Sequence, residues 1–229
     1  MSSSRWSAHG NTYLVTPERL DPELVRSRAG DADGVIEVFR HDGARVEIAI
    51  WNPDGSRAEM SGNGTRIAAR WLAEQTGADV VTVVVGQREV HAMMLDGDLV
   101  EQDLGEVQVG EPEEVAGLRV VTVDVGNPHA VVDGDPAELP AIGPLLETHE
   151  RFPRRTNVQV AHRVAPGELE ARVWERGVGE TASSGTSAVA VAAAFGLEDA
   201  TVHFPGGSLS VRFEGRRAFL TGPAVRDDA

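Results

Sequence analysis

The sequence predicts an α/β (α+β) protein made of two similar, pseudo-symmetric domains, each with antiparallel strands wrapped around a central helix. Three observations lead to this prediction. Short segments of alternating apolar and polar residues recur along the chain, as in half-buried strands. Two segments are hydrophobic nearly all round at helical spacing, which is typical of buried helices. The order of strands, one apolar helix and more strands occurs first in one half and then again in the other.

We place the first domain at residues 1–110. Its predicted strands are residues 9–15, 34–40, 44–51, 80–85, 89–95 and 99–105, with turns at "HDGA" (41–44) and "NPDG" (52–55). A short helix at 21–29 is expected to be capped by Asp21, and the apolar helix at 65–77 to end at Gly77. The polar segment "VGEPEEVAG" (109–117) is expected to be a linker.

We place the second domain at residues 111–229, and it repeats this plan. Its predicted strands are two within residues 118–133, around a Gly-Asn-Pro turn, and those at 156–164, 169–177, 200–204, 207–214 and 217–222. A helix-like segment covers 138–152, and an Ala-rich helix covers 186–196 with Gly196 as its cap. Each half therefore holds one central apolar helix.

Composition excludes several classes of protein. Hydrophobic residues make up 41% of the 229, enough for a packed core, and no apolar run is long enough for a membrane helix. The start has no apolar stretch typical of a signal peptide, so we expect a cytoplasmic protein. The net charge of −15 argues against nucleic-acid and anionic-membrane partners. The chain has no Cys and its seven His are scattered, so neither disulfides nor a metal site is expected.

Two helix starts resemble one another. Residues 59–70 read "EMSGNGTRIAAR" and residues 180–194 read "ETASSGTSAVAVAAA", which puts Ser61 and Ser184 in matching places 123 residues apart. A helix N-terminus presents unpaired N–H groups and a partial positive charge, and Gly lets a carboxylate approach that backbone. Two facing N-termini would suit removal of a proton from one face of a carbon and its return to the other. The alternative is that each Ser is only an N-cap.

The few asparagines are candidate functional residues. All 21 basic residues are Arg, and Asn occurs only five times, so a coding bias has removed residues that could be spared. The Asn that remain are Asn11, Asn52, Asn63, Asn127 and Asn157. They are candidates for positions that need a carboxamide, although Asn also serves turns.

Motifs from residue 9 to residue 224 resemble the diaminopimelate epimerases. They are "HGN", "DADGV", "WNPDGSRAEMSGNGTRIAAR", "GNPHAVV", "GPLLETHERFPRRTNV", "VWERGVGETASSGTSAVA", "FPGGSLSV" and "LTGPA". The resemblance implies two pseudo-symmetric domains with the site in the cleft between them. It also implies an amino-acid substrate, no organic or metal cofactor, and a homodimer.

The same resemblance assigns roles to individual residues. It implies that four asparagines hold polar groups of the substrate, that Asn63 lies on the loop receiving the reacting carboxylate, and that Arg176 pairs with the distal carboxylate. Glu175 and His129 would lie beside the reacting carbon, and Gly62, Gly185 and Thr186 would supply backbone donors. The four substrate-binding asparagines are Asn11, Asn52, Asn127 and Asn157.

The departure from the family lies at the two catalytic positions. The family has a Cys at each helix N-terminus, one acting as base and one as acid, where this chain has Ser61 and Ser184. A Ser hydroxyl is far less acidic than a thiol and needs a separate base, for which His129 and Glu175 are the candidates. Neighbouring Ser183 and Ser187 also depart from the pattern, which favours a natural variant over an engineered one.

Three functions are therefore considered. The first is an epimerase that interconverts LL- and meso-diaminopimelate by proton transfer at the α-carbon, with Ser61 and Ser184 as catalytic residues. The second is a Cys-less form that binds such an amino acid with little or no turnover. The third is a related isomerase acting on another small acid.

Overall fold

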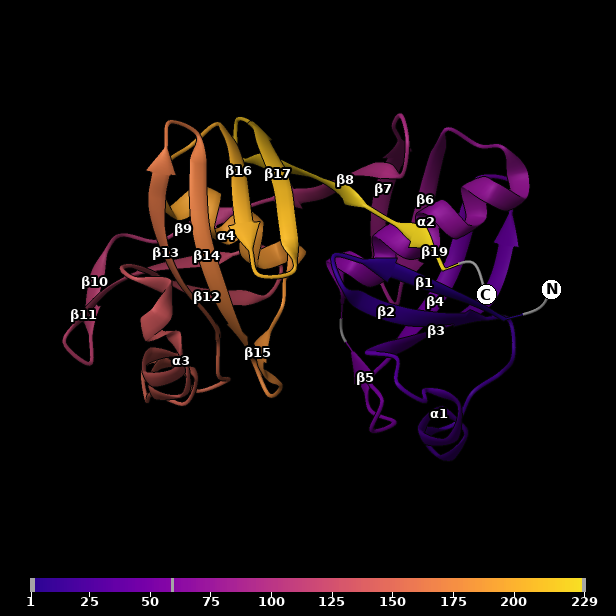
Figure 1. Cartoon of the computed structure of the whole chain (residues 1–229), viewed down its shortest axis with the longest axis horizontal. Helices are drawn as coiled ribbons and strands as arrows, with labels where there is room; N and C mark the ends of the chain where they lie inside the picture. Colours follow the sequence, from indigo (N-terminus) through magenta and orange to yellow (C-terminus); the bar gives the residue numbers. More distant parts are fainter. Residues whose placement is uncertain (1–2, 59, 228–229) are drawn as a thin grey trace. The chain divides into compact units, whose positions relative to one another are not determined.

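The chain forms two compact units in a computed structural model that describes residues 3–58 and 60–227. Unit 1 is Met1–Asp103 together with Thr221–Ala229, and unit 2 is Leu104–Leu220. The chain passes from one unit to the other within strand β8 (Leu99–Glu106) and within strand β18 (Arg217–Pro223) (Figure 1). The units differ from the expected halves, 1–110 and 111–229, because the boundary comes earlier and the C-terminal segment belongs to unit 1.

Unit 1 wraps its strands around helix α2. Its other elements are β1 (Ser4–Ala8), β2 (Asn11–Thr16), α1 (Pro22–Arg28), β3 (Gly34–Asp42), β4 (Arg45–Trp51), β5 (Arg57–Ala58), α2 (Gly62–Thr76), β6 (Val80–Val85), β7 (Arg88–Met94) and β19 (Val225–Arg226). Neighbouring strands pair antiparallel, except that β2 pairs parallel with β3 and β4 parallel with β6. Helices α1 and α2 are the crossovers of these two parallel pairs.

Unit 2 wraps its strands around helix α4. Its elements are β9 (Gln108–Val109), β10 (Glu113–Val115), β11 (Leu118–Asp124), β12 (Pro128–Asp133), a 3₁₀ turn (Pro136–Glu138), α3 (Leu139–Glu147), β13 (Asn157–Ala165), β14 (Glu168–Glu175), β15 (Gly179–Thr181), α4 (Gly185–Ala194), β16 (Asp199–Phe204) and β17 (Gly207–Glu214). Here β12 pairs parallel with β13 and β14 parallel with β16, and α3 and α4 are the crossovers.

The two units repeat one pairing scheme. The run of antiparallel and parallel pairs from β1 to β7 recurs from β11 to β17. Tyr13 lies opposite Gly34 in unit 1, and His129 lies opposite Asn157 in unit 2. From Gly34 and Asn157 to the central helices, equivalent residues are 123 positions apart. Equivalent pairs are therefore Tyr13 with His129, Trp51 with Trp174, Asn52 with Glu175 and Ser61 with Ser184.

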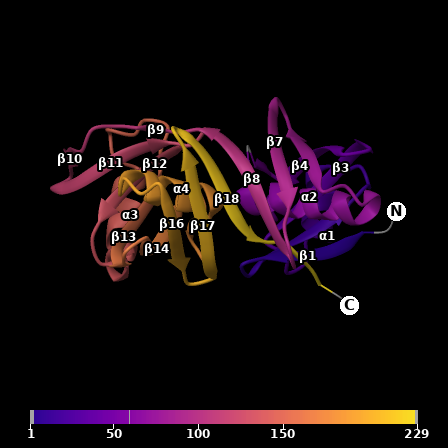
Figure 2. The same ribbon diagram turned by 90° about the horizontal axis from the view of Figure 1, so that it is seen from above.

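Each unit is completed by a short strand that follows the segment of chain arriving from the other unit. Strand β9 follows β8 and pairs with β11, while β19 follows β18 and pairs with β1. Figure 2 shows β18 leading toward the C-terminus beside β8. The predicted linker at 109–117 is wrong for residues 113–115, because β10 pairs antiparallel with β11 there.

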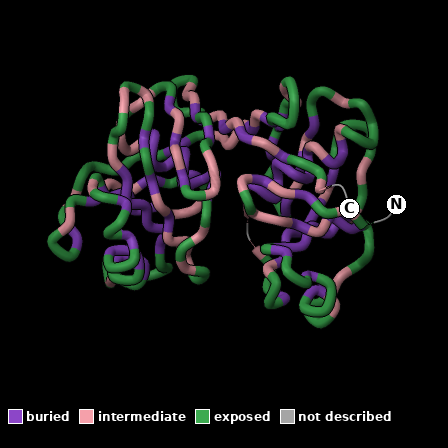
Figure 3. Tube along the Cα trace, viewed as in Figure 1, coloured by how far each residue is buried: buried purple, intermediate pink, exposed green. Residues whose placement is uncertain are grey.

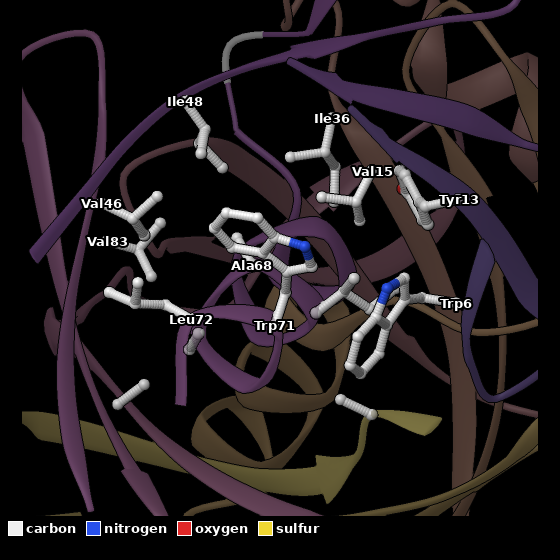
Figure 4. Close-up of a cluster of buried hydrophobic side chains, with 14 of the residues drawn as sticks. Trp6, Tyr13, Val15, Ile36, Val46, Ile48, Ala68, Trp71, Leu72 and Val83 are labelled. Carbon is white, nitrogen blue, oxygen red and sulfur yellow. The ribbon is translucent and has the colours of Figure 1, made fainter. Parts of the chain in front are cut away.

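Each central helix lies in a hydrophobic core. In unit 1, Trp6, Ile36, Trp71 and Leu72 are at most 3% exposed and gather around α2 (Figure 4). In unit 2, α4 is buried along most of its length, and its small Ala side chains let strands of the unit approach closely. Figure 3 shows buried segments in the interior of each unit. Smaller clusters lie under α1 and under α3.

Element boundaries differ from the sequence predictions in three respects. Helix α2 begins at Gly62 rather than at residue 65, and α4 begins at Gly185, because an N-cap serine precedes each. Helix α3 ends at Glu147, well before residue 152. Strands β1, β5 and β15 are not predicted at all, since they are short and carry weak alternation. No helix within the described residues is long and apolar enough to cross a membrane.

Candidate active site at two helix N-termini

Ser61 is the N-cap of helix α2 and is held by two hydrogen bonds. Its backbone is extended (φ −137°, ψ 122°), and its Oγ accepts a bond from the Gly64 N–H at 3.0 Å. The Tyr13 Oη lies 3.0 Å from the same Oγ. A Cβ at position 64 would lie 3.0 Å from the Ile50 Cδ1 and 3.3 Å from the Ser61 Cβ, so a larger residue would crowd this N-cap. Ser61 therefore does cap the helix, and it also contacts a second hydroxyl.

Asn11, Asn63 and Arg66 form a chain of hydrogen bonds beside Ser61. The Asn63 Nδ2 donates to the Asn11 Oδ1 at 2.7 Å, and the Arg66 Nη2 donates to the Asn63 Oδ1 at 2.7 Å. The Arg66 Nε donates to the Pro223 carbonyl at 2.9 Å. Arg66 is fully buried, and burial lowers its pKa to about 10, so it stays a cation at neutral pH. Asn11 and Asn63, two of the predicted site residues, thus lie together, and Gly62 links Asn63 to Ser61.

Asn52 serves a turn. Its N–H donates to the Ser56 carbonyl and its Nδ2 to the Ser56 Oγ, both at 2.9 Å, while its carbonyl accepts from the Gly55 N–H. These bonds close the loop between β4 and β5. A substrate-binding role for Asn52 stays a prediction.

Ser184 occupies the equivalent position before helix α4 but is bonded differently. Its backbone is extended (φ −148°, ψ 128°), yet among the described residues its side chain accepts no capping hydrogen bond. Ser184 is 8% exposed, and Gly185 and Thr186 follow it as buried first residues of the helix. The Thr186 Oγ1 accepts a long bond of 3.4 Å from the Asn127 Nδ2.

His129 lies in a buried polar chain. Its Nε2 is 3.0 Å from the Asn127 Oδ1, and its Nδ1 is 3.1 Å from the Gln159 Nε2, which also donates to the Ser187 Oγ. Burial lowers the His129 pKa to about 3, outweighing the Gln159 bond, and the charge of Arg176 lowers it further. The ring is therefore neutral, with Nε2 donating to Asn127 and Nδ1 accepting from Gln159. Both ring nitrogens are engaged by amides rather than by Ser184.

Asn157, Glu175 and Arg176 lie together where β13 begins and β14 ends. The Asn157 Oδ1 accepts from the Arg176 N–H at 2.9 Å, and its Nδ2 donates to the Pro128 carbonyl. The Glu175 Oε1 accepts from the Thr181 Oγ1 at 2.6 Å. Burial raises the pKa of Glu175, and the Thr181 bond opposes that rise. This cluster offers a carboxylate, an amide and a guanidinium on one side of unit 2.

Sequence reasoning misses Tyr13, Arg66, Gln159 and Glu147. Glu147 of α3 accepts bonds from the Trp174 Nε1 and the Gly177 N–H, both at 2.8 Å, and so fixes the turn that carries Arg176. One signal was available in the sequence. Tyr13 and His129 each follow a site asparagine by two residues, so in a strand they share its face. The described residues hold no cluster of three or more His, Asp or Glu suited to a metal ion.

Chemically, each unit offers groups suited to proton transfer at carbon. Each has a helix N-terminus, whose partial positive charge attracts a carboxylate, and a serine hydroxyl at its start. Unit 2 adds charged groups that could hold a second polar end of a substrate. The individual roles assigned to these residues stay predictions.

Comparison with known proteins identifies the family. The family model described as Diaminopimelate epimerase matches residues 121–226. Diaminopimelate epimerase from Synechococcus sp. is 36% identical, covering 98% of this chain and 95% of that protein. Diaminopimelate epimerase from Pelotomaculum thermopropionicum is 37% identical, covering 94% and 92%.

Solved structures show the same fold at low identity. A predicted epimerase from Pseudomonas aeruginosa has a TM-score of 0.73 at 16% identity, covering 99% of this chain and 96% of that one. A hydroxyproline epimerase from Agrobacterium vitis has a TM-score of 0.71 at 17% identity, covering 98% and 88%. The identity of 36–37% with these relatives over nearly the whole chain shows that the chain belongs to the diaminopimelate epimerase family.

Proposed function

We propose that this chain is a cofactor-independent epimerase that inverts the α-carbon of a diaminopimelate-like amino acid. The observation that carries the proposal is the identity of 36–37% with diaminopimelate epimerases over nearly the whole chain. The equivalent N-cap positions of Ser61 and Ser184 support it, since an inversion needs a proton acceptor on one face of the carbon and a proton donor on the other.

The proposed reaction is a two-sided proton transfer. One serine, in its deprotonated form, removes the α-proton while the other, still protonated, delivers its proton to the opposite face of the same carbon, so that the two serines exchange protonation states. The N–H groups that begin α2 and α4 stabilise the negative charge that develops on the α-carboxylate. Arg176 holds the distal carboxylate, and the site asparagines hold the remaining polar groups. A homodimer in the cytoplasm is proposed as the working state, and light scattering tests the dimer.

Exchange of the α-proton in deuterated water tests this function. LL- and meso-diaminopimelate are each incubated with the folded protein, and deuterium at the α-carbon is followed by NMR. We expect deuterium to enter with inversion, and Ser61→Ala or Ser184→Ala to abolish inversion, since each removes one of the two groups. Absence of exchange by a folded protein at high concentration would refute the activity.

Binding without turnover is the second candidate, and one observation favours it. In the described part of the chain, the hydrogen bonds of His129 go to Asn127 and Gln159, and that of Glu175 goes to Thr181, so neither activates a serine. Calorimetric titration with the same two compounds separates the cases. Binding without exchange supports this candidate, turnover of another small acid in a substrate panel supports a related isomerase, and neither binding nor turnover refutes both.

A further inference from the structure

We propose that Tyr13 is a positioning residue that relays a proton to and from Ser61, with the buried Arg66 guanidinium balancing the charge that the relay leaves behind. The inference deepens the proposed function and rests on it, since it names what makes a serine at this place able to exchange a proton.

The relay begins with the bonds around the Ser61 Oγ. The Gly64 N–H donates to this oxygen at 3.0 Å, and the Tyr13 Oη lies 3.0 Å away. Either hydroxyl can donate in the Tyr13–Ser61 bond, so a proton can lie on either side of it. The Oγ keeps a further lone pair or its own proton for a substrate.

The Tyr13 ring is fixed in position by its surroundings. It lies opposite Gly34 in the parallel β2–β3 pair, and a Cβ at position 34 would come 2.5 Å from the Tyr13 Cε1. Only glycine leaves room for the ring there. Tyr13 is 9% exposed and belongs to the core cluster around α2 (Figure 4). The phenol therefore meets Ser61 with little loss of freedom on reaction.

Arg66 supplies a positive charge that the described structure leaves without an anionic partner. Its hydrogen bonds go to the Asn63 amide and to the Pro223 carbonyl, and its Nη1 is buried with no hydrogen-bond partner among the described residues. Burial lowers the pKa of Arg66, and a charge on Tyr13 raises it, so the two groups interact electrostatically. A phenolate formed at Tyr13 is therefore stabilised by this cation.

The proton balance of the relay closes with Ser184, in its deprotonated form, taking the α-proton on the opposite face. As the Ser61 O–H bond breaks and its proton goes to the α-carbon, the Tyr13 O–H bond breaks and its proton goes to the Ser61 Oγ. The products are a neutral serine and a phenolate that interacts electrostatically with Arg66. In reverse, the phenolate takes the serine proton while the Oγ takes the α-proton. A phenol, with an ordinary pKa of ~10, is a far stronger acid than an aliphatic hydroxyl, so the charge rests on the better group.

A double-mutant cycle between positions 13 and 61 tests the relay. Tyr13→Phe keeps the ring and removes only the hydroxyl. In the parent, we expect it to slow α-proton exchange by about 10²-fold with little change in KM. In a Ser61→Cys background we expect a cost at least tenfold smaller, because a thiol at a helix N-terminus ionises by itself. Equal costs in the two backgrounds would overturn the relay and leave Tyr13 a structural role.

A second readout does not depend on turnover. Tyr13 is the only tyrosine of the chain, so [¹³Cζ]tyrosine labelling gives one NMR signal. We expect this signal to move in Ser61→Ala and to stay in place in the matched variant Ser184→Ala. An unmoved signal in both variants overturns the Tyr13–Ser61 contact itself. A signal that moves in a protein without α-proton exchange refutes the proposed function and leaves the contact standing.

Discussion

The N-terminus of α2 and the N-terminus of α4 occupy equivalent places in units of equivalent pairing, but their serines have different surroundings. Ser61 accepts a capping bond and contacts Tyr13, with a buried cation nearby. Ser184 accepts no capping bond within the described residues. The residue equivalent to Tyr13 is His129, which is neutral and bonded to two amides.

The comparison teaches that a duplicated topology conserves where a group lies without conserving its protonation chemistry. Strand register places Tyr13 and His129 alike, yet Tyr13 contacts the N-cap serine of its unit, whereas His129 contacts Asn127 and Gln159. Arg66 has its equivalent in Val189, an apolar residue of α4 that is fully buried. The α2 N-terminus thus has a phenol and a buried cation nearby, whereas the α4 N-terminus has a neutral imidazole and an apolar side chain at the equivalent positions.

The largest expected effect comes from placing a thiol at both helix N-termini. Ser61→Cys with Ser184→Cys should raise α-proton exchange with inversion by ~10²–10⁴-fold, since each helix N-terminus lowers the pKa of a thiol. Exchange and inversion of LL-diaminopimelate measure it. Each single variant should gain little, because inversion needs both an acid and a base.

Two outcomes would contradict this expectation. If the parent already matches the double variant, the two hydroxyls are competent and the gain from thiols is absent. If the double variant folds and binds diaminopimelate but stays inert, binding without turnover becomes the better account of the protein.

A smaller effect is expected at the two tryptophan–glutamate hydrogen bonds. Glu147→Gln removes the carboxylate that accepts from Trp174 and Gly177, and should lower the free energy of unfolding by ~1–3 kcal/mol. KM should also rise, because the turn carrying Arg176 loosens. Glu37→Gln is the matched control, since Glu37 accepts from the equivalent Trp51 at 2.9 Å and should leave KM unchanged.

The hydrogen bonds of Glu147 predict a pH dependence of stability. Burial would raise the pKa of Glu147, but the bonds from Trp174 and Gly177 lower it on balance. The stabilisation is therefore present above the unfolded-state pKa of ~4.3 and is lost as the pH falls through the lower folded-state value. Urea denaturation at several pH values should show Glu147→Gln with a shallower decline below that pH. Parallel curves for parent and variant would argue against it.

Glu175→Gln should change the free energy of unfolding by a still smaller amount, and should raise it rather than lower it. Burial raises the Glu175 pKa, so the stability that this side chain contributes at low pH is lost as the pH rises through the folded-state value. The variant should gain on the order of 1 kcal/mol at neutral pH and bind diaminopimelate more weakly. The gain should vanish below pH ~4, where the parent is also neutral; a gain that persists there would contradict the electrostatic origin.

The smallest expected effect lies in two neighbouring serines of unit 2. The Ser183 Oγ is buried with no hydrogen-bond partner among the described residues, whereas the Ser187 Oγ accepts from Gln159. Ser183→Ala should raise the free energy of unfolding by up to about 1 kcal/mol, and Ser187→Ala should lower it by a similar amount. Thermal unfolding compares the pair; a loss in both would mean that Ser183 has a partner such as water.

The strands and helices that the sequence predicts well are those with strong local patterns. Strands β3, β4, β6 and β7 alternate clearly, and Gly77 takes the left-handed conformation (φ 72°) expected of a cap. Strand β1 is missed because only Trp6 and Ala8 of "SRWSA" face the core. Such strands exist through their pairing partners, which lie far away in the sequence.

The candidate site divides along the same line. The serine N-caps follow from local spacing and the asparagines from their rarity, and the resemblance to a family adds the roles of the asparagines and Arg176. The Tyr13–Ser61 contact joins residues 48 positions apart, and the burial of a charged Arg66 depends on the carbonyl of Pro223. Neither contact has a local pattern, so register and tertiary packing are needed to find them.

The exchange of short strands between the units has a consequence for the order of folding during synthesis. Unit 2 is continuous in sequence, whereas unit 1 needs β19, which the ribosome makes after all of unit 2. The unit that begins first is therefore completed second. Ala224, 1% exposed in the core of unit 1, and Pro223, which binds Arg66, both belong to that late segment. In a nascent chain, Arg66 of α2 therefore lacks its hydrogen bond to the Pro223 carbonyl until unit 2 has been made.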